Sequence, residues 1–182
     1  MVPAKYFSDK KARDPSGLLK LMDMIDYGYV DKNRKAHTDI NDDFDKKYVL
    51  QSPGELLQSK IGVCWDQVEF EREFFRTLGC QFETYAIIYY DDKDYPTHTF
   101  LVFETQDGWS WFEHSWGPHR GIHKYPTKQL LLKDVKTKFI SSLSDFANDH
   151  ENLCIYKYDK PKSGLGCLQF YKHCESGENI KI

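Results

Sequence analysis

The stretch KIGVCWDQVEFEREFF, residues 60–75, decides the architecture of this chain. It places Cys64 directly after a Gly-Val pair, at the first turn of a predicted helix that runs to Gly79, a residue suited to end it. Trp65, Val68, Phe75 and Leu78 lie at helical spacing, which favours a helix packed on a sheet. Cys64 is then either a small buried hydrophobe or a nucleophile stabilised by the helix dipole.

The segments before this helix also have helical signals. SPGELLQSK (52–60) combines Ser52 as N-cap, Pro53 at the first helical position and Glu55 three residues after the serine, which predicts a short capped helix ending by Gly62. Apolar residues between Leu18 and Ile25 predict another helix, ending near Gly28. We expect residues 1–14 to be frayed or extended, and residues 31–47 to form a long charged surface loop.

After the Cys64 helix the pattern changes to that of strands. Residues 82–90, 97–105 and 109–116 are rich in β-branched and aromatic residues and are separated by turn signals, which predicts an antiparallel meander. A helix is expected over 125–143 and a last strand over 152–158. The result is one α+β domain over residues 1–182, in which N-terminal helices pack on an antiparallel meander. We expect residues 1–14 and 176–182 to be flexible.

Composition excludes several classes of function. The chain has 182 residues, is 40% hydrophobic and 15% aromatic, and carries a net charge of −3, so no basic field attracts nucleic acid. No apolar run reaches the roughly 18 residues of a membrane span, and the N-terminus lacks the apolar region of a secretory signal, so we expect a cytoplasmic protein without membrane contact. Five loosely spaced cysteines favour reduced thiols over a disulfide framework.

The meander supplies partners for a cysteine nucleophile. Such chemistry needs a thiolate, a base that also protonates the leaving group, and a residue that orients the base. His98 opens the second predicted strand and Glu113 lies in the third. The turn at Gln106 and Asp107 mirrors position 98 onto about 115, so His98 and Glu113 come almost opposite each other, within reach of a hydrogen bond.

The motifs GVCWDQ, THTFLVFE and GWSWFE together resemble the transglutaminase-like superfamily of papain-fold cysteine enzymes, over roughly residues 50–116. The resemblance implies a papain-like core in which Cys64 is the nucleophile, His98 the general acid/base and Glu113 the orienting acid. Glu stands where Asp is commoner in that family. The accessory domains and calcium sites of the large animal cross-linking enzymes have no counterpart, so cross-linking activity is not implied.

Other residues are candidates for the surroundings of this site. The Cys64 backbone N–H is one expected oxyanion donor, with Gln58 as a second and Trp65 as a weaker candidate that more naturally walls the cleft. His114, Trp116 and Arg120 are candidates to line the cleft, Arg120 for a substrate carboxylate or a structural ion pair. A further set of tyrosines forms either a substrate platform or part of the core: Tyr27, Tyr29, Tyr89, Tyr90 and Tyr95.

No metal or other cofactor is expected. His114, His119 and His123 are loosely spaced around Gly and Pro, and no carboxylate or thiol completes a tetrahedron. The CLQFYKHC segment (167–174) has adjacent His and Cys at its end, an awkward arrangement for zinc, and the acidic runs around 39–45 and 91–94 lack the glycine and glutamate of a calcium loop.

The sequence therefore predicts a cysteine hydrolase or acyltransferase that attacks an amide or acyl carbon through a thioester, with a protein or peptide amide as substrate. Resolution of the thioester by water would make it a protease or deamidase, and resolution by an amine a transglutaminase. The alternative is a catalytically silent or partner-dependent binding module that uses the same cleft for recognition.

Overall fold

A computed structural model describes residues 2–41, 43–90, 95–143 and 152–182. The N-terminal part contains helices α1 (Ala4–Asp9) and α2 (Pro15–Leu21), the 3-10 turn η1 (Met22–Met24), strands β1 (Tyr29–Val30) and β2 (Ala36–His37), and helix α3 (Phe44–Lys47). Helices α4 (Pro53–Ser59) and α5 (Cys64–Leu78) follow. The remaining elements are β3 (Phe82–Tyr89), β4 (Thr97–Thr105), β5 (Gly108–Glu113), η2 (Gly117–His119), β6 (Gly121–Tyr125), α6 (Lys128–Ser142), β7 (Leu153–Lys157), α7 (Cys167–Glu175) and β8 (Glu178–Ile180).

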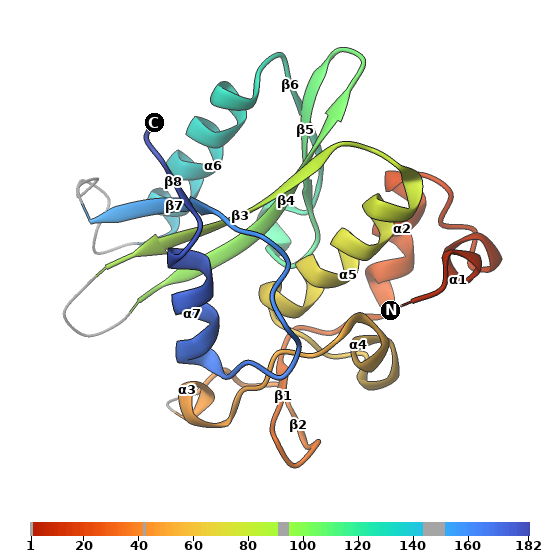
Figure 1. Cartoon of the computed structure of the whole chain (residues 1–182), viewed down its shortest axis with the longest axis vertical. Coiled ribbons are helices and arrows are strands. Elements are labelled where there is room, and N and C mark those ends of the chain that lie inside the picture. Colours follow the sequence, from red (N-terminus) through yellow and green to blue (C-terminus); the bar gives the residue numbers. More distant parts are fainter. Residues whose placement is uncertain (1, 42, 91–94, 144–151) are drawn as a thin grey trace.

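The centre of the molecule is a six-stranded antiparallel sheet with the order β6-β5-β4-β3-β7-β8 (Figure 1). Strands β3, β4 and β5 form the predicted meander, and the α+β class is confirmed. The tight turn between β4 and β5 is also confirmed, because Thr105 pairs with Gly108 across it.

Alternate residues of the central strands face two different layers. Leu101 and Phe112 belong to a core with Phe74 of α5, whereas Val102 and Trp111 belong to a core with α6. Side chains of a strand alternate between the two faces of its sheet, so α5 and α6 cover opposite faces. The sheet is therefore enclosed in a helix–sheet–helix arrangement.

The two helices that flank the sequence GV before Cys64 form as predicted. The Ser52 hydroxyl accepts from the Glu55 N–H, and the Glu55 carboxylate accepts from the Ser52 N–H, completing the capping box of α4. Helix α5 starts at Cys64 and ends at Gly79, which adopts the left-handed conformation with φ of 67°.

Both chain ends differ from the expectation. Residues 1–14 were expected to be frayed or extended, but residues 4–9 form α1, whose Phe7 ring packs on Phe70 and Phe74 of α5. Residues 178–180, in the segment expected to be flexible, form β8 and pair with β7. These short segments gain their structure from burial against the rest of the chain, which local patterns do not record.

Four further elements were missed. The charged segment 31–47 contains β2 and α3, the segment after Trp116 contains β6, which pairs with β5, and residues 167–175 form α7. The predicted turn around residues 91–94 lies outside the described residues.

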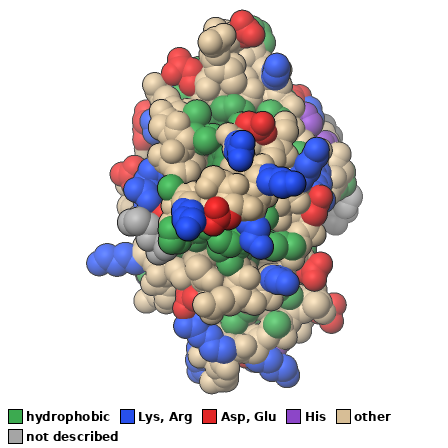
Figure 2. Space-filling model, turned by 90° about the vertical axis from the view of Figure 1, so that its right-hand side faces the viewer, with side chains coloured by type: hydrophobic (Ala, Val, Ile, Leu, Met, Phe, Trp, Pro, Cys, Tyr) green, Lys and Arg blue, Asp and Glu red, His purple; other side chains and the backbone are tan. Residues whose placement is uncertain are grey.

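The face that carries α1 has basic side chains spread over its middle, with acidic and hydrophobic ones among them (Figure 2).

Candidate active site

The start of α5 is held by a buried carboxylate. Asp66, in the first turn, accepts hydrogen bonds from the N–H of Val63 at 3.1 Å, the N–H of Gln51 at 2.8 Å and the hydroxyl of Tyr48 at 3.0 Å. Burial raises the pKa of Asp66 to about 7, although these three donors oppose the shift. The carboxylate thereby ties the segments before and after α4 to the helix end that carries Cys64.

A second polar link holds the turn before Cys64. Gln67 donates from Nε2 to the Gly62 carbonyl at 2.8 Å, and its Oε1 accepts from Nδ1 of His114 at 2.6 Å. Because Oε1 only accepts, the proton of His114 resides on Nδ1. Burial lowers the pKa of His114, which keeps this ring neutral. The link fixes the end of β5 to the loop that presents Cys64.

His98 and Glu113 form the buried pair that the sequence predicted. His98 Nε2 lies 2.7 Å from Glu113 Oε2. The register pairs Leu101 with Phe112, so position 113 falls opposite Phe100 and the contact is diagonal rather than direct. A longer Glu side chain suits this diagonal, because it spans the extra distance between the two strands.

Further hydrogen bonds orient Glu113. Its other oxygen, Oε1, accepts from the Ser115 hydroxyl at 3.0 Å and from the Trp116 N–H at 2.7 Å. The Trp116 ring lies 5.1 Å from the His98 ring, measured between centroids. The bend after β5 thus both fixes the carboxylate and covers the imidazole.

The electrostatics favour an imidazolium–carboxylate pair. Burial by itself would lower the pKa of His98, but the charge of Glu113 and the interaction with Cys64 outweigh it and raise the pKa to about 10. Burial would likewise raise the pKa of Glu113, but His98 and the Trp116 N–H lower it overall. At neutral pH this geometry therefore holds His98 charged.

Cys64 completes the group from the helix side. Its side chain interacts with His98, and because Nε2 of His98 faces Glu113, Nδ1 is the ring nitrogen free for the sulfur. An adjacent cation and a helix N-terminus both stabilise a thiolate. Cys64 is only 3% exposed, and Tyr27 lies against it. Desolvation of its hydroxyl and the interaction with Cys64 raise the pKa of Tyr27, although the residue as a whole is 49% exposed.

A second buried acid lies close to the same group. Glu71 lies seven residues after Cys64 on α5 and is 2% exposed, and its Oε2 has no hydrogen-bond partner within the described part of the chain. Burial, reinforced by the charge of Glu113, raises the pKa of Glu71 well above its usual value. Burial therefore favours the neutral carboxylic acid form of Glu71.

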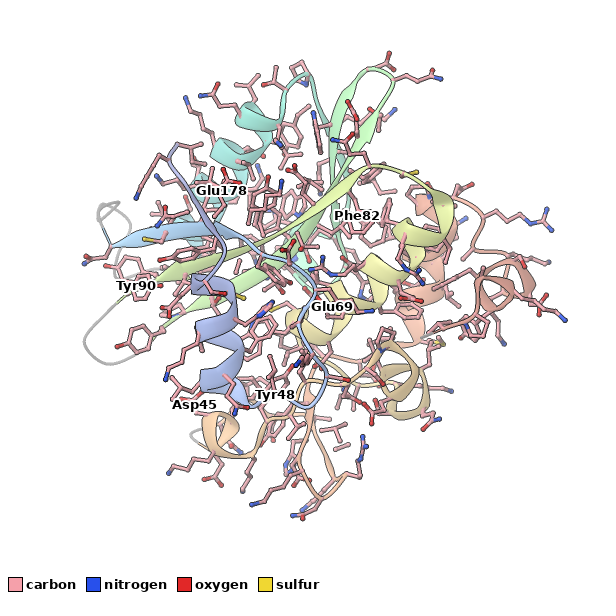
Figure 3. The ribbon with its side chains drawn as sticks, in the orientation of Figure 1. Asp45, Tyr48, Glu69, Phe82, Tyr90 and Glu178 are labelled. Carbon is pink, nitrogen blue, oxygen red and sulfur yellow. The ribbon has the colours of Figure 1, made fainter. Side chains whose placement is uncertain are left out.

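A cleft of about 490 Å³ opens over Cys64, a size typical of small-ligand sites. Helices α3 and α7, which lie side by side in Figure 1, contribute to its walls. Asp45 on α3 is the one charged residue among the described residues that line it, and it accepts from the Cys167 thiol at 3.1 Å, at the start of α7 (Figure 3). Large apolar and aromatic side chains also line the cleft: Tyr27, Ile40, Phe44, Trp65, Tyr95 and Tyr171.

The structure does not bring Gln58 to the site. This side chain is exposed on α4 and lines a different hollow, with Val30 and Arg34, because the left-handed turn at Lys60 redirects the chain between α4 and α5. The oxyanion role expected of Gln58 is therefore wrong. Trp65 does line the cleft as expected, and its indole stacks on the ring of Phe170 with the ring centroids 4.5 Å apart.

The remaining candidates have other places. Arg120 pairs with Asp23, so it joins the start of β6 to η1 as a structural ion pair. His114 belongs to the link with Gln67 described above, and Trp116 covers His98. Of the tyrosines, Tyr27 and Tyr95 line the cleft, whereas Tyr29 and Tyr89 are buried.

Sequence reasoning missed the polar residues of α5 that support the site. Asp66, Gln67 and Glu71 lie within two turns of Cys64, and a signal existed: polar residues occupy positions 67 and 71, three and seven after Cys64, on the helix face predicted to be buried. Over the described ranges, no group of three or more potential ligands could hold a metal ion. All five cysteines lie in these ranges and none forms a disulfide.

In comparisons with known proteins, no protein-family model matches the chain, and no curated protein matches its sequence. Among the described helices, none has the length and apolar character needed to cross a membrane.

Proposed function

We propose that this chain is a cysteine-dependent acyl-transfer enzyme with a papain-like, transglutaminase-like core, acting on an amide or related acyl carbon of a protein or peptide. The observation that carries the proposal is the 2.7 Å contact between His98 and Glu113, buried beside Cys64 at the N-terminus of α5. Cys64 lines the cleft, and the base and its orienting acid are buried beside it. No cofactor is required for this chemistry.

The proposed reaction follows from the roles of the three residues. The Cys64 sulfur attacks the carbonyl carbon, and the backbone N–H of Cys64 at the helix start stabilises the negative oxygen that forms. His98 gives its proton to the departing amine, and Glu113 stabilises the imidazolium before this transfer. The product is a thioester on Cys64. Neutral His98 then takes a proton from water or from a second amine, which attacks the thioester and releases Cys64.

Differential alkylation tests this proposal with controls inside the same chain. Iodoacetamide labelling at pH 6, read by peptide mass spectrometry, should modify Cys64 at least tenfold faster than Cys80 and Cys154. Both controls are more exposed than Cys64, so access alone predicts the opposite order. His98→Ala should abolish the advantage of Cys64. Equal rates at the three thiols in the wild type would refute the proposal.

A second candidate function is a recognition module that keeps the cleft without catalysis. The 3% exposure of Cys64 and the position of Tyr27 against it favour this alternative. It predicts that Cys64 reacts no faster than Cys80 at any pH between 5 and 9. It also predicts that peptides bound in the cleft are released without chemical change. An enzyme would instead form a hydroxamate from an amide substrate in the presence of hydroxylamine.

A further inference from the structure

Exposed apolar side chains gather at the cleft over Cys64. Among the described residues, five large hydrophobic side chains are exposed, and three of them line this cleft: Tyr27 at 49%, Ile40 at 47% and Tyr95 at 52%. The other two, Leu130 and Leu168, do not line it. Apolar groups left in water around one concave site mark a place where an apolar partner binds.

The wall of the cleft is an ordered set of rings. Tyr171 packs edge-on against Trp65 with centroids 5.3 Å apart, and against Tyr95 at 6.3 Å. The Tyr171 hydroxyl donates to the Tyr95 carbonyl at 2.7 Å. Phe44 adds a further ring, 5.7 Å from Trp65. A wall that is already packed loses little conformational entropy when a ligand binds.

The charge of the lining selects further among ligands. Asp45 is the one charged residue among the described residues that line the cleft, and it is acidic. An acidic ligand side chain would lie near a carboxylate without a basic partner in the lining. The cleft is thus suited to a large neutral side chain and unsuited to an acidic one.

We propose that the cleft is the specificity subsite of the enzyme and takes a large apolar or aromatic side chain of a peptide next to the amide that Cys64 attacks. This inference rests on the proposed function. Trp65 adjoins Cys64 and Tyr95 lies at the exposed rim, so a side chain on this wall has its backbone carbonyl near the sulfur. The aromatic substrate platform raised from the sequence corresponds to Tyr27 and Tyr95 alone.

Three chloroacetamides of matched intrinsic reactivity test the subsite. They carry an N-(2-phenylethyl), an N-(2-methoxyethyl) or an N-(2-carboxyethyl) group, and the rate is followed at Cys64 by peptide mass spectrometry. We expect the phenylethyl probe to react at least tenfold faster than the methoxyethyl probe and to show saturation, with the carboxyethyl probe slowest. Cys80 in the same molecules should not discriminate among the three.

Matched variants separate the cleft from general surface hydrophobicity. The double variant Ile40→Ala, Tyr95→Ala should lose most of the preference for the phenylethyl probe. The control Leu130→Ala, Leu168→Ala removes two comparably exposed side chains elsewhere and should retain it. Loss of preference in both variants, or in neither, would overturn the inference.

The outcomes distinguish the two proposals. If Cys64 outreacts Cys80 in a His98-dependent way but does not discriminate among the probes, the subsite is refuted and the proposed catalytic group stands. If Cys64 is unreactive, the proposed function fails, and occupancy is read instead from the indole N–H signal of Trp65 in NMR spectra. A shift with N-acetylphenylalanine amide and none with N-acetylglycine amide supports the subsite; no shift with either overturns it.

Discussion

At the scale of single residues, Gln67 makes two buried hydrogen bonds that no apolar side chain can replace. It donates to the Gly62 carbonyl and accepts from His114, so it joins the turn before Cys64 to the end of the strand that carries Glu113. Both partners are buried. The spacing between Cys64 and the His98–Glu113 pair therefore depends on one amide group.

Replacement of Gln67 by leucine should destabilise the protein by about 2–4 kcal/mol, because two buried groups lose a partner and each orphaned group costs about 1–3 kcal/mol. Urea unfolding measures the change. The control is Gln58→Leu, the same substitution on an exposed position of α4, which should change stability by less than about 0.5 kcal/mol. Equal effects of the two variants would show that Gln67 does not hold the turn.

At the scale of elements, α5 begins where it does because of Asp66. This carboxylate accepts from three donors that belong to the segments before and after α4, and its bond from the Val63 N–H is the half of a capping box that the third helical residue supplies. The position of Cys64 at the helix end is a consequence. The dipole at that end acts on the sulfur only while the first turn is intact.

Asp66→Asn should therefore destabilise the protein by about 2–4 kcal/mol, since the amide nitrogen would face a donor that now has no acceptor. It should also slow the alkylation of Cys64 at pH 6 relative to Cys80. Asp39→Asn, an exposed substitution in the loop after β2, is the matched control and should leave both measurements unchanged. A variant with normal stability and normal Cys64 reactivity would contradict this role of Asp66.

The elements that the sequence predicted correctly are those with strong local signals. Ser52, Pro53 and Glu55 fixed α4, Gly79 ended α5, and a tight turn at residues 106–107 set the hairpin that brings His98 to Glu113. β6, β8, α1 and α7 were missed because they are short and owe their structure to partners distant in sequence, as with Phe7 on α5. The role expected of Gln58 was wrong because the left-handed turn at Lys60, for which no local signal was recognised, redirects the chain between α4 and α5.

At the scale of the whole molecule, the sheet lies between α5 and α6, and the site is formed where the α5 side meets the ends of β4 and β5. Folding raises the pKa of Glu71 and of His98, and also those of Asp66 and Glu69, each of the last two to about 7. These groups bind protons more tightly in the folded protein than in the unfolded chain. Their effects on the pH dependence of stability have the same sign.

The sign follows from proton linkage. The folded protein holds more protons than the unfolded chain once pH exceeds the ordinary pKa of each group, near 4.5 for Glu71 and 6.5 for His98. The free energy of unfolding then falls as pH rises, by up to about 1.4 kcal/mol per pH unit for each group. For His98 the loss continues up to its folded pKa of about 10. Stability should thus decrease from pH 6.5 to pH 9.

Glu71→Gln isolates the contribution of the buried acid. The amide has the same shape as the protonated carboxyl but cannot ionise in either state, so the variant should show a flatter stability curve and be more stable than the wild type at pH 8. Urea unfolding between pH 5 and pH 9 measures this. Glu104→Gln, at an exposed position of β4, should keep the wild-type slope.

His98→Ala should lose the part of the slope above pH 6.5. An unchanged slope of stability against pH in both His98→Ala and Glu71→Gln would mean that neither group is buried in its protonated form.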